Sequence, residues 1–202
     1  MTLKTLDNFR TITRRSEGIY KEKGSKFLSF AIPVTDAEEV KSIVAAFRKE
    51  YYDARHVCYA YVLGADRTEF RANDDGEPSG TAGRPILGQI HSANLTYILI
   101  IVVRYFGGIL LGTGGLITAY KAAAADAIAN NEIVEQEVTI ALEIEFDYLT
   151  MNDVMSLLKE TDTAVTEQQF DMTCRMKLSV RQAIYPMFMA KLEKIESLRV
   201  VE

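Results

Sequence analysis

The first two thirds of the chain carry hydrophobic patterns typical of a mixed α/β domain. Polar and apolar residues alternate over residues 26–34, and a similar pattern over 57–63 predicts a second strand. Residues 95–103 are apolar on both faces and rich in β-branched side chains. Because a strand that is buried on both faces loses its alternation, this run predicts the central strand of a sheet.

Two helices are predicted in the same region. Three apolar residues share one helical face, at spacings of four and three: Val40, Val44 and Phe47. Thr35 or Asp36 precedes them as an N-cap. A longer helix is predicted from about residue 116 to 129. Residues 71–85 carry neither period and predict a loop.

The last third of the chain has its own order of elements. Strands are predicted over 137–146, 164–170, 172–180 and 197–201, with helices over 149–159 and 182–195. The order β-α-β-β-α-β is the split βαβ, ferredoxin-like motif. The sequence therefore predicts an α+β fold with two domains, 1–135 and 137–202.

Length and composition exclude several classes of protein. The 202 residues are 48% hydrophobic, which is enough for real cores and excludes intrinsic disorder. Cys58 and Cys174 are too few for a disulfide framework and fit a reducing compartment. The N-terminal residues contain no apolar segment of a secretory signal. The longest apolar run is far shorter than the roughly 20 residues of a membrane span. We expect a cytoplasmic protein without a membrane partner.

The charge is unevenly distributed. Residues 137–202 contain seven basic and 12 acidic residues, which accounts for the whole net charge of −5. Residues 1–26 contain seven basic residues and three acidic ones. We predict a basic cluster of Arg14, Arg15, Lys21, Lys23 and Lys26 that faces an anionic partner, assisted by Arg55 and Arg104. The alternative is an ordinary solvated strand.

An acidic loop is the first candidate site. Residues 73–87 hold three acidic side chains among glycines and prolines, with one arginine: Asp74, Asp75, Glu77 and Arg84. Such a cluster can hold Mg²⁺, but the spacing is not that of an EF-hand. We favour a loop that is locked by aspartate–backbone hydrogen bonds and an Arg84 salt bridge, and we predict no bound metal.

A glycine-rich segment is the second candidate site. Five glycines lie between the central strand and the following helix: Gly107, Gly108, Gly112, Gly114 and Gly115. A glycine loop at a helix start exposes N–H groups that suit a phosphate or carboxylate. Thr113 stands where a P-loop needs lysine, and Ile117 where a dinucleotide fingerprint needs glycine or alanine. An anion-binding loop and close packing of loop on sheet remain as alternatives.

Catalytic groups are scarce. The chain has two histidines, His56 and His91, and His56 lies two residues before Cys58 on a predicted strand. A Cys–His pair is conceivable, but residues two apart on a strand share a face without being placed for proton transfer. Two histidines and two cysteines that are far apart do not make a zinc site. We therefore favour a structural histidine and predict no cofactor.

Three motifs resemble the YigZ/IMPACT family. They are ARHVCYAY at 54–61, DDGEPSGTAGRPIL at 74–87 and RYFGGILLGTGGLITAY at 104–120. The resemblance implies a first domain with the fold of a small-subunit ribosomal protein's second domain and of domain IV of elongation factor G. It implies a second domain that is similar to another domain of that factor. One departure is Thr118, where bacterial relatives often carry lysine or arginine.

The resemblance also implies a role in translation. Eukaryotic relatives regulate translation initiation through a protein partner. We expect a translation-associated regulatory protein that binds RNA, the ribosome or a translation-control protein. An isoelectric point near 5.2 argues against a dedicated nucleic-acid binder.

The alternative is a small-molecule hydrolase or phosphotransferase that uses the acidic loop 74–77 and the glycine loop 107–115. The two loops are expected side by side, with Arg84 or Arg104 paired to a loop carboxylate. The residues predicted to bind a ligand or partner are Lys21, Lys23, Lys26, Arg55, His56, Asp74, Asp75, Glu77, Arg84, Arg104, Tyr105, Gly107, Gly108, Gly112 and Gly114.

Overall fold

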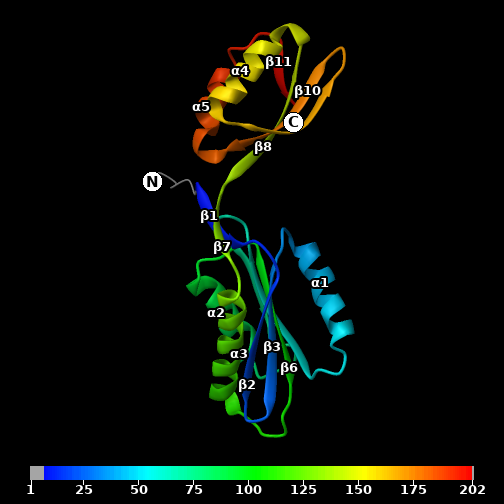
Figure 1. Cartoon of the computed structure of the whole chain (residues 1–202), viewed down its shortest axis with the longest axis vertical. Coiled ribbons are helices and arrows are strands. Elements are labelled where there is room, and N and C mark those ends of the chain that lie inside the picture. The colour runs from blue at the N-terminus through cyan, green and yellow to red at the C-terminus, as the bar shows by residue number, and fades with distance from the viewer. Residues whose placement is uncertain (1–6, 202) are drawn as a thin grey trace. The chain divides into compact units, whose positions relative to one another are not determined.

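The computed structural model describes residues 7–201, which form two compact units (Figure 1). Phe9–Gln136 make up the first unit, and residues 137–201 make up the second together with residues 7 and 8. Each unit combines helices and strands, so the α+β fold class predicted from the sequence is confirmed. Within the described residues, no helix combines the length and the apolar character that crossing a bilayer requires.

The first unit is built on a five-stranded antiparallel sheet. In spatial order its strands are β2 (Ser16–Glu22), β3 (Ser25–Pro33), β6 (Ile98–Tyr105), β4 (His56–Leu63) and β5 (Glu69–Asn73). The central strand is β6, and every residue in it except Tyr105 is buried. This confirms the central strand that the apolar run predicted.

Helices cover both faces of this sheet. α1 (Ala37–Glu50) lies on one face, and α2 (Gly83–Ser92) and α3 (Gly112–Ala129) lie on the other (Figure 1). Asp36 caps α1 as predicted, because its carboxylate accepts hydrogen bonds from the first-turn N–H groups of Glu38 and Glu39. The predicted apolar face of α1 is buried against the sheet.

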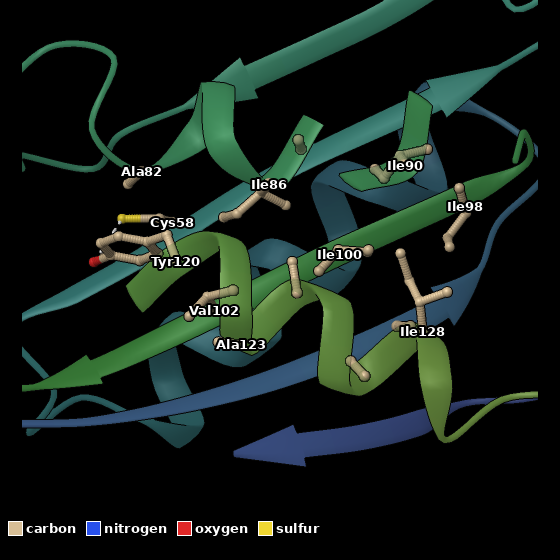
Figure 2. Packing of buried hydrophobic residues seen from close by; sticks show 14 of the residues in the cluster. Cys58, Ala82, Ile86, Ile90, Ile98, Ile100, Val102, Tyr120, Ala123 and Ile128 are labelled. Carbon is tan, nitrogen blue, oxygen red and sulfur yellow. Dashed lines mark hydrogen bonds between the residues drawn. The ribbon is translucent and has the colours of Figure 1, made fainter. Parts of the chain in front are cut away.

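The core between the sheet and the helix pair α2–α3 is made mainly of aliphatic side chains, with Cys58 and Tyr120 among them (Figure 2). Ile86 and Ile90 of α2 face Ile100 of β6, and Ala123 of α3 lies beside them. Small residues let α3 approach the sheet closely, and the Ser29 hydroxyl of β3 donates to the Ala123 carbonyl at 2.6 Å. This contact fixes the helix that carries the glycine-rich segment at its N-terminus.

Several elements differ from the predictions. The predicted loop over 71–85 holds the end of β5 and the start of α2. The mostly exposed edge strand β5 has no apolar alternation to reveal it, and Pro85 sits in the first turn of α2, where its missing N–H costs nothing. α3 begins at Gly112, four residues before the predicted start, because glycines there hid its first turn. The strand β2 was also not predicted.

A separate two-stranded sheet is formed by β1 (Asn8–Ile12) and β7 (Ile133–Glu137).

The second unit contains β8 (Thr139–Phe146), α4 (Met151–Thr161), β9 (Ala164–Phe170), β10 (Cys174–Arg181), α5 (Tyr185–Leu192) and β11 (Leu198–Val201). Its antiparallel sheet has the order β11-β8-β10-β9, with a core that includes Ile144, Phe146 and Phe188. This confirms the ferredoxin-like motif, although α5 is shorter than predicted.

Candidate functional site

The acidic loop and the glycine-rich segment lie side by side, as predicted. Both line a pocket of about 420 Å³. Glu77 and Pro78 contribute from the acidic loop, and residues between Arg104 and Leu116 contribute from the glycine-rich segment. Arg55 and His56, where β4 begins, complete the lining. The segments that looked unusual in the sequence therefore meet at one end of the first sheet.

A buried ion pair lines this pocket. Arg104 donates through Nη1 to Glu77 Oε1 at 2.6 Å, and the two side chains are 6% and 3% exposed. The Tyr120 hydroxyl donates to the same carboxylate oxygen at 2.8 Å. The Arg104 guanidinium also lies over the rings of Phe27 and Phe106. A buried charge needs a partner of opposite sign, so Glu77 and Arg104 hold each other in place. Of the two predicted partners, Arg104 is therefore the one that pairs.

His56 and Cys58 each bond to the acidic loop rather than to each other. His56 Nδ1 lies 2.7 Å from the carbonyl oxygen of Asp75, so this nitrogen carries the proton and donates it. Its Nε2 then faces Glu77 Oε1 at 3.8 Å. The Cys58 thiol donates to the Asp74 carbonyl, and burial raises its pKa well above the usual range. A buried thiol of this kind is a poor nucleophile, so the structure provides no Cys–His pair here.

The two aspartates of the loop are consumed by structural hydrogen bonds. Asp74 accepts from three backbone N–H groups, those of Gly80, Ala82 and Gly83, at 2.8 to 3.0 Å. Burial opposes ionisation of Asp74, but these three donors outweigh it and hold the pKa of the carboxyl below its usual range. Asp74 thereby supplies the N-terminal cap of α2 that Ala82 lacks.

Asp75 is held by a different set of donors. It accepts from the Val57 backbone N–H at 2.7 Å and from Arg48 at 2.5 Å. The predicted locking of the loop by aspartate–backbone bonds is thus confirmed. The predicted Arg84 salt bridge is wrong, because Arg84 forms no ion pair with any residue in 7–201 and Arg48 stands in that role. Within the same residues, no cluster of three or more His, Cys, Asp or Glu side chains could hold a metal.

The glycines divide into two groups with different roles. A Cβ on Gly107 would lie 1.9 Å from the Gly24 carbonyl carbon, so this glycine lets the segment pack against the β2–β3 turn. At Gly108, Gly112 and Gly114 an added Cβ would meet nothing within 4 Å. Gly112 and Gly114 belong to the first turn of α3, which has no side-chain cap. Close packing is therefore confirmed at Gly107, and anion binding at the other glycines stays a prediction.

The predicted basic cluster is split in two. Lys21, Lys23 and Lys26 lie on the β2–β3 hairpin, whose turn contacts Gly107 beside the pocket. Arg14 and Arg15 lie at the opposite end of β2, where Arg15 pairs with Glu17.

The structure places two further candidates differently from the prediction. Arg104 is buried in the wall of the pocket, so it is not an exposed contact for an RNA backbone. Tyr105 donates its hydroxyl to Asp53 and does not line the pocket.

Seven residues that line the pocket were not among the predicted site residues: Gly76, Pro78, Phe106, Leu110, Leu111, Thr113 and Leu116. Phe106 and Leu110 are 38% and 82% exposed. The available signal was a pair of large apolar side chains set among glycines in a loop, where the sequence analysis considered only the glycines.

Comparison with known proteins supports the resemblance. Residues 23–128 match the family model of the Impact N-terminal domain. The chain is 34% identical over 174 residues to the IMPACT family member YigZ of Escherichia coli (strain K12), and the match covers 84% of each chain. The chain belongs to the IMPACT family. The IMPACT family member YvyE of Bacillus subtilis (strain 168) is 32% identical over 162 residues, which cover 80% of this chain and 75% of the relative.

The similarity to a solved structure extends over both units. A crystal structure described as that of a hypothetical protein has a TM-score of 0.73 to this chain and is 30% identical to it, with coverage of 96% of this chain and 97% of the other. The matched region of the Impact N-terminal domain contains Lys23 and Lys26, the acidic loop and the start of α3, and Lys21 lies two residues before it. The pocket therefore belongs to the part of the chain that defines the family.

Proposed function

We propose that this IMPACT-family protein is a cytoplasmic, translation-associated regulatory protein whose first domain binds the phosphate backbone of RNA, free or in the ribosome. Family membership supports the association with translation. The contact surface is the hairpin end of the first sheet, defined by Lys21, Lys23 and Lys26 with Arg55 nearby. The reducing environment implied by two free, buried thiols supports the cytoplasm.

The observation that carries this proposal is the arrangement of the three lysines. Lys21 and Lys26 are cross-strand partners on β2 and β3, and like charges in that position destabilise a hairpin. Lys23 occupies the turn with φ of 44°, a left-handed conformation that costs a residue other than glycine about 1–2 kcal/mol. None of the three forms an ion pair within residues 7–201. The positive φ of Lys23 is what a two-residue hairpin turn requires, and an anionic partner would offset the repulsion between Lys21 and Lys26.

The acidic excess of residues 137–202 fits the same proposal. Those residues would repel phosphate and so restrict contact to the first domain. The near-neutral charge of residues 1–136 hides the lysines from a whole-chain isoelectric point. A low isoelectric point is therefore compatible with a local RNA contact.

The test is co-sedimentation of the full chain with ribosomes and with single-stranded RNA over a salt series. With three to five phosphates engaged, log affinity should fall against log salt with a slope of about −2 to −3.5. Lys21→Glu with Lys26→Glu should weaken binding to every sequence alike and flatten the slope by about 1.4, since phosphate contacts carry no sequence information.

The matched control is Lys41→Glu with Lys49→Glu. It makes the same charge change on the exposed surface of α1, away from the β2–β3 hairpin. This control should bind as the unmodified chain does. Equal loss in both double variants, or no retention of RNA or ribosomes at low salt, contradicts the proposal.

The alternative of a hydrolase or phosphotransferase receives less support. It relies on free carboxylates in the acidic loop, whereas Asp74 and Asp75 are held by backbone and arginine donors and Glu77 is paired with Arg104. The pocket does bring Glu77, Arg104 and Gly112 together. That convergence is better explained by ligand binding, as argued next.

A further inference from the structure

The pocket beside the start of α3 has the size and walls of a small-molecule site. Its volume of about 420 Å³ is within the range of ligand pockets, roughly 300–1,000 Å³. One side is apolar, formed by Pro78, Phe106 and Leu110. Phe106 and Leu110 keep much of their surface exposed, although apolar side chains of this size gain by burial. An organic group that settles against them would provide that burial.

The start of α3 lines the same pocket and has free N–H groups. α3 is 18 residues long, its N-cap residue Leu111 makes no side-chain cap, and its first turn contains no acidic residue. The first-turn N–H groups of a helix have no partner within the helix, and the helix dipole favours an anion there. Gly114 costs helix stability, yet an added Cβ there would meet nothing within 4 Å. Packing therefore does not explain this glycine, whereas access of a ligand to the backbone does.

Arg104 provides an independent observation. It is 5% exposed and lines the pocket, and its Nε has no hydrogen-bond partner within residues 7–201. Buried guanidinium nitrogens are normally satisfied, so Arg104 keeps an unused donor in the wall of the pocket, as Arg67 and Arg181 do elsewhere in the described residues. Arg55 adds a second positive charge at the rim, with its guanidinium 5.7 Å from the centre of the Phe106 ring. Glu77 offsets one of these two charges, so the pocket keeps a positive balance.

We propose that this pocket binds a phosphate monoester that carries an aromatic group, of the size of a nucleoside monophosphate. The phosphate lies at the first turn of α3, between Arg55 and Arg104, and the aromatic group lies against Phe106, Leu110 and Pro78. The same chemistry is offered by a free nucleotide and by the 5′-phosphorylated end of an RNA. This site is distinct from the lysine hairpin and does not depend on the proposed backbone contact.

The primary experiment is titration of the full chain with adenosine monophosphate. Binding is measured from amide chemical shifts by NMR and from the heat of binding by calorimetry. The amides of residues 112–115 should shift and saturate. Adenosine, which lacks the phosphate, and inorganic phosphate, which lacks the organic group, should each bind at least about tenfold more weakly. A pentanucleotide with a 5′-phosphate should bind and its 5′-hydroxyl form should not. Whichever binds with the lower dissociation constant, the nucleotide or the phosphorylated pentanucleotide, shows whether the ligand is a free nucleotide or an RNA end.

The decisive variant is Thr113→Glu, an exposed position in the first turn of α3. A carboxylate there stabilises the helix and competes with phosphate, so the chain folds while nucleotide binding should weaken about tenfold or more. Its control is Lys121→Gln, which makes the same charge change at an exposed position farther along α3 and should bind normally. Unchanged binding in Thr113→Glu, equal loss in both variants, or no shift of residues 112–115 overturns the proposal.

The two proposals fail separately. Lys21→Glu with Lys26→Glu should lose RNA backbone binding and keep binding of adenosine monophosphate. If that double variant loses the nucleotide as well, the pocket is not an independent site and this inference is wrong. If RNA never binds but the nucleotide shifts residues 112–115 as expected, only the proposed function is wrong.

Discussion

At the scale of single residues, Asp74 shows how one carboxylate organises the candidate site. Three backbone N–H groups at the start of α2 donate to it, and its own carbonyl accepts from the Cys58 thiol. Asp74 thus connects the loop and α2 through its carboxylate and reaches β4 through its backbone carbonyl. The bonds require the ionised form, which is why the pKa of Asp74 lies below its usual range.

This contact makes stability depend on pH. A carboxyl whose pKa is lowered in the folded state stabilises the fold above its unfolded pKa, and the effect is lost as pH falls through the folded value. Asp74→Asn should therefore reduce the free energy of unfolding by about 1–3 kcal/mol at pH 7. The difference from the unmodified chain should narrow as pH falls below the ordinary pKa range of aspartate, and it should vanish only as pH falls through the lower folded pKa of Asp74. Urea unfolding at several pH values measures both quantities.

The control for this change is Asp66→Asn. Among the residues that the structure describes, the carboxylate that it replaces accepts hydrogen bonds only from the nearby Thr68. Asparagine can accept the same local bond, so the loss should be small and nearly independent of pH. If the free energy of unfolding of Asp74→Asn stays below that of the unmodified chain by the same amount at every acidic pH, the charge of Asp74 does not contribute to stability.

At the scale of elements, close packing of α3 on β2 and β3 sets the position of the pocket. Gly18 of β2 lies so near α3 that an added Cβ would meet the Ala127 backbone nitrogen at 2.5 Å. The Ile19 N–H donates to Asp126 at 2.8 Å, and the Ser16 hydroxyl donates to the Ala127 carbonyl at 2.6 Å. These contacts hold the C-terminal half of α3 against the sheet, and the first turn of the same helix lines the pocket.

Two glycine substitutions separate packing from helix propensity. Gly18→Ala should destabilise the chain by about 1–3 kcal/mol, because the methyl group has no room against α3. Gly88→Ala lies in α2, where an added Cβ would meet nothing within 4 Å, and it should stabilise the chain by about 0.5–1 kcal/mol. Chemical denaturation of the two variants measures both. Changes of the same sign would contradict this account of the packing.

At the scale of the whole molecule, the chain consists of two units with separate cores. The first unit has apolar clusters on both faces of its sheet, and the second has one cluster beneath its four strands. The connection runs through β7, whose last three residues are exposed. The sequence prediction of domains at 1–135 and 137–202 leads to a direct experiment.

Limited proteolysis with an enzyme that cleaves after glutamate should cut first between residues 131 and 138. Glu132, Glu135 and Glu137 lie in this stretch, and exposed connections between domains are preferred sites of cleavage. Mass spectrometry of the early fragments identifies the site. A variant with glutamine at these three positions should resist the first cut. Early cleavage inside either unit would contradict the predicted partition.

Sequence patterns alone determined the elements whose apolar residues repeat regularly. The capped helix α1, the buried strand β6 and the ferredoxin-like order of the last third were all predicted. The edge strands β2 and β5 were not, because a strand with little buried surface shows little alternation. The whole helix α2 was not predicted either, and its cap comes from Asp74 eight or nine residues earlier in the chain.

The tertiary structure alone decided which candidate residues act together. Charge in the sequence did not distinguish Arg84 from Arg104 as a partner of Glu77, and the sheet brought Arg104 there from 27 residues away. The sheet also separated Arg14 and Arg15 from the three hairpin lysines. The two arginines precede β2, and the lysines lie around the turn at the other end of that strand. A local pattern records which face of an element is apolar. Ion pairs and pockets depend on contacts between distant segments, which only the fold specifies.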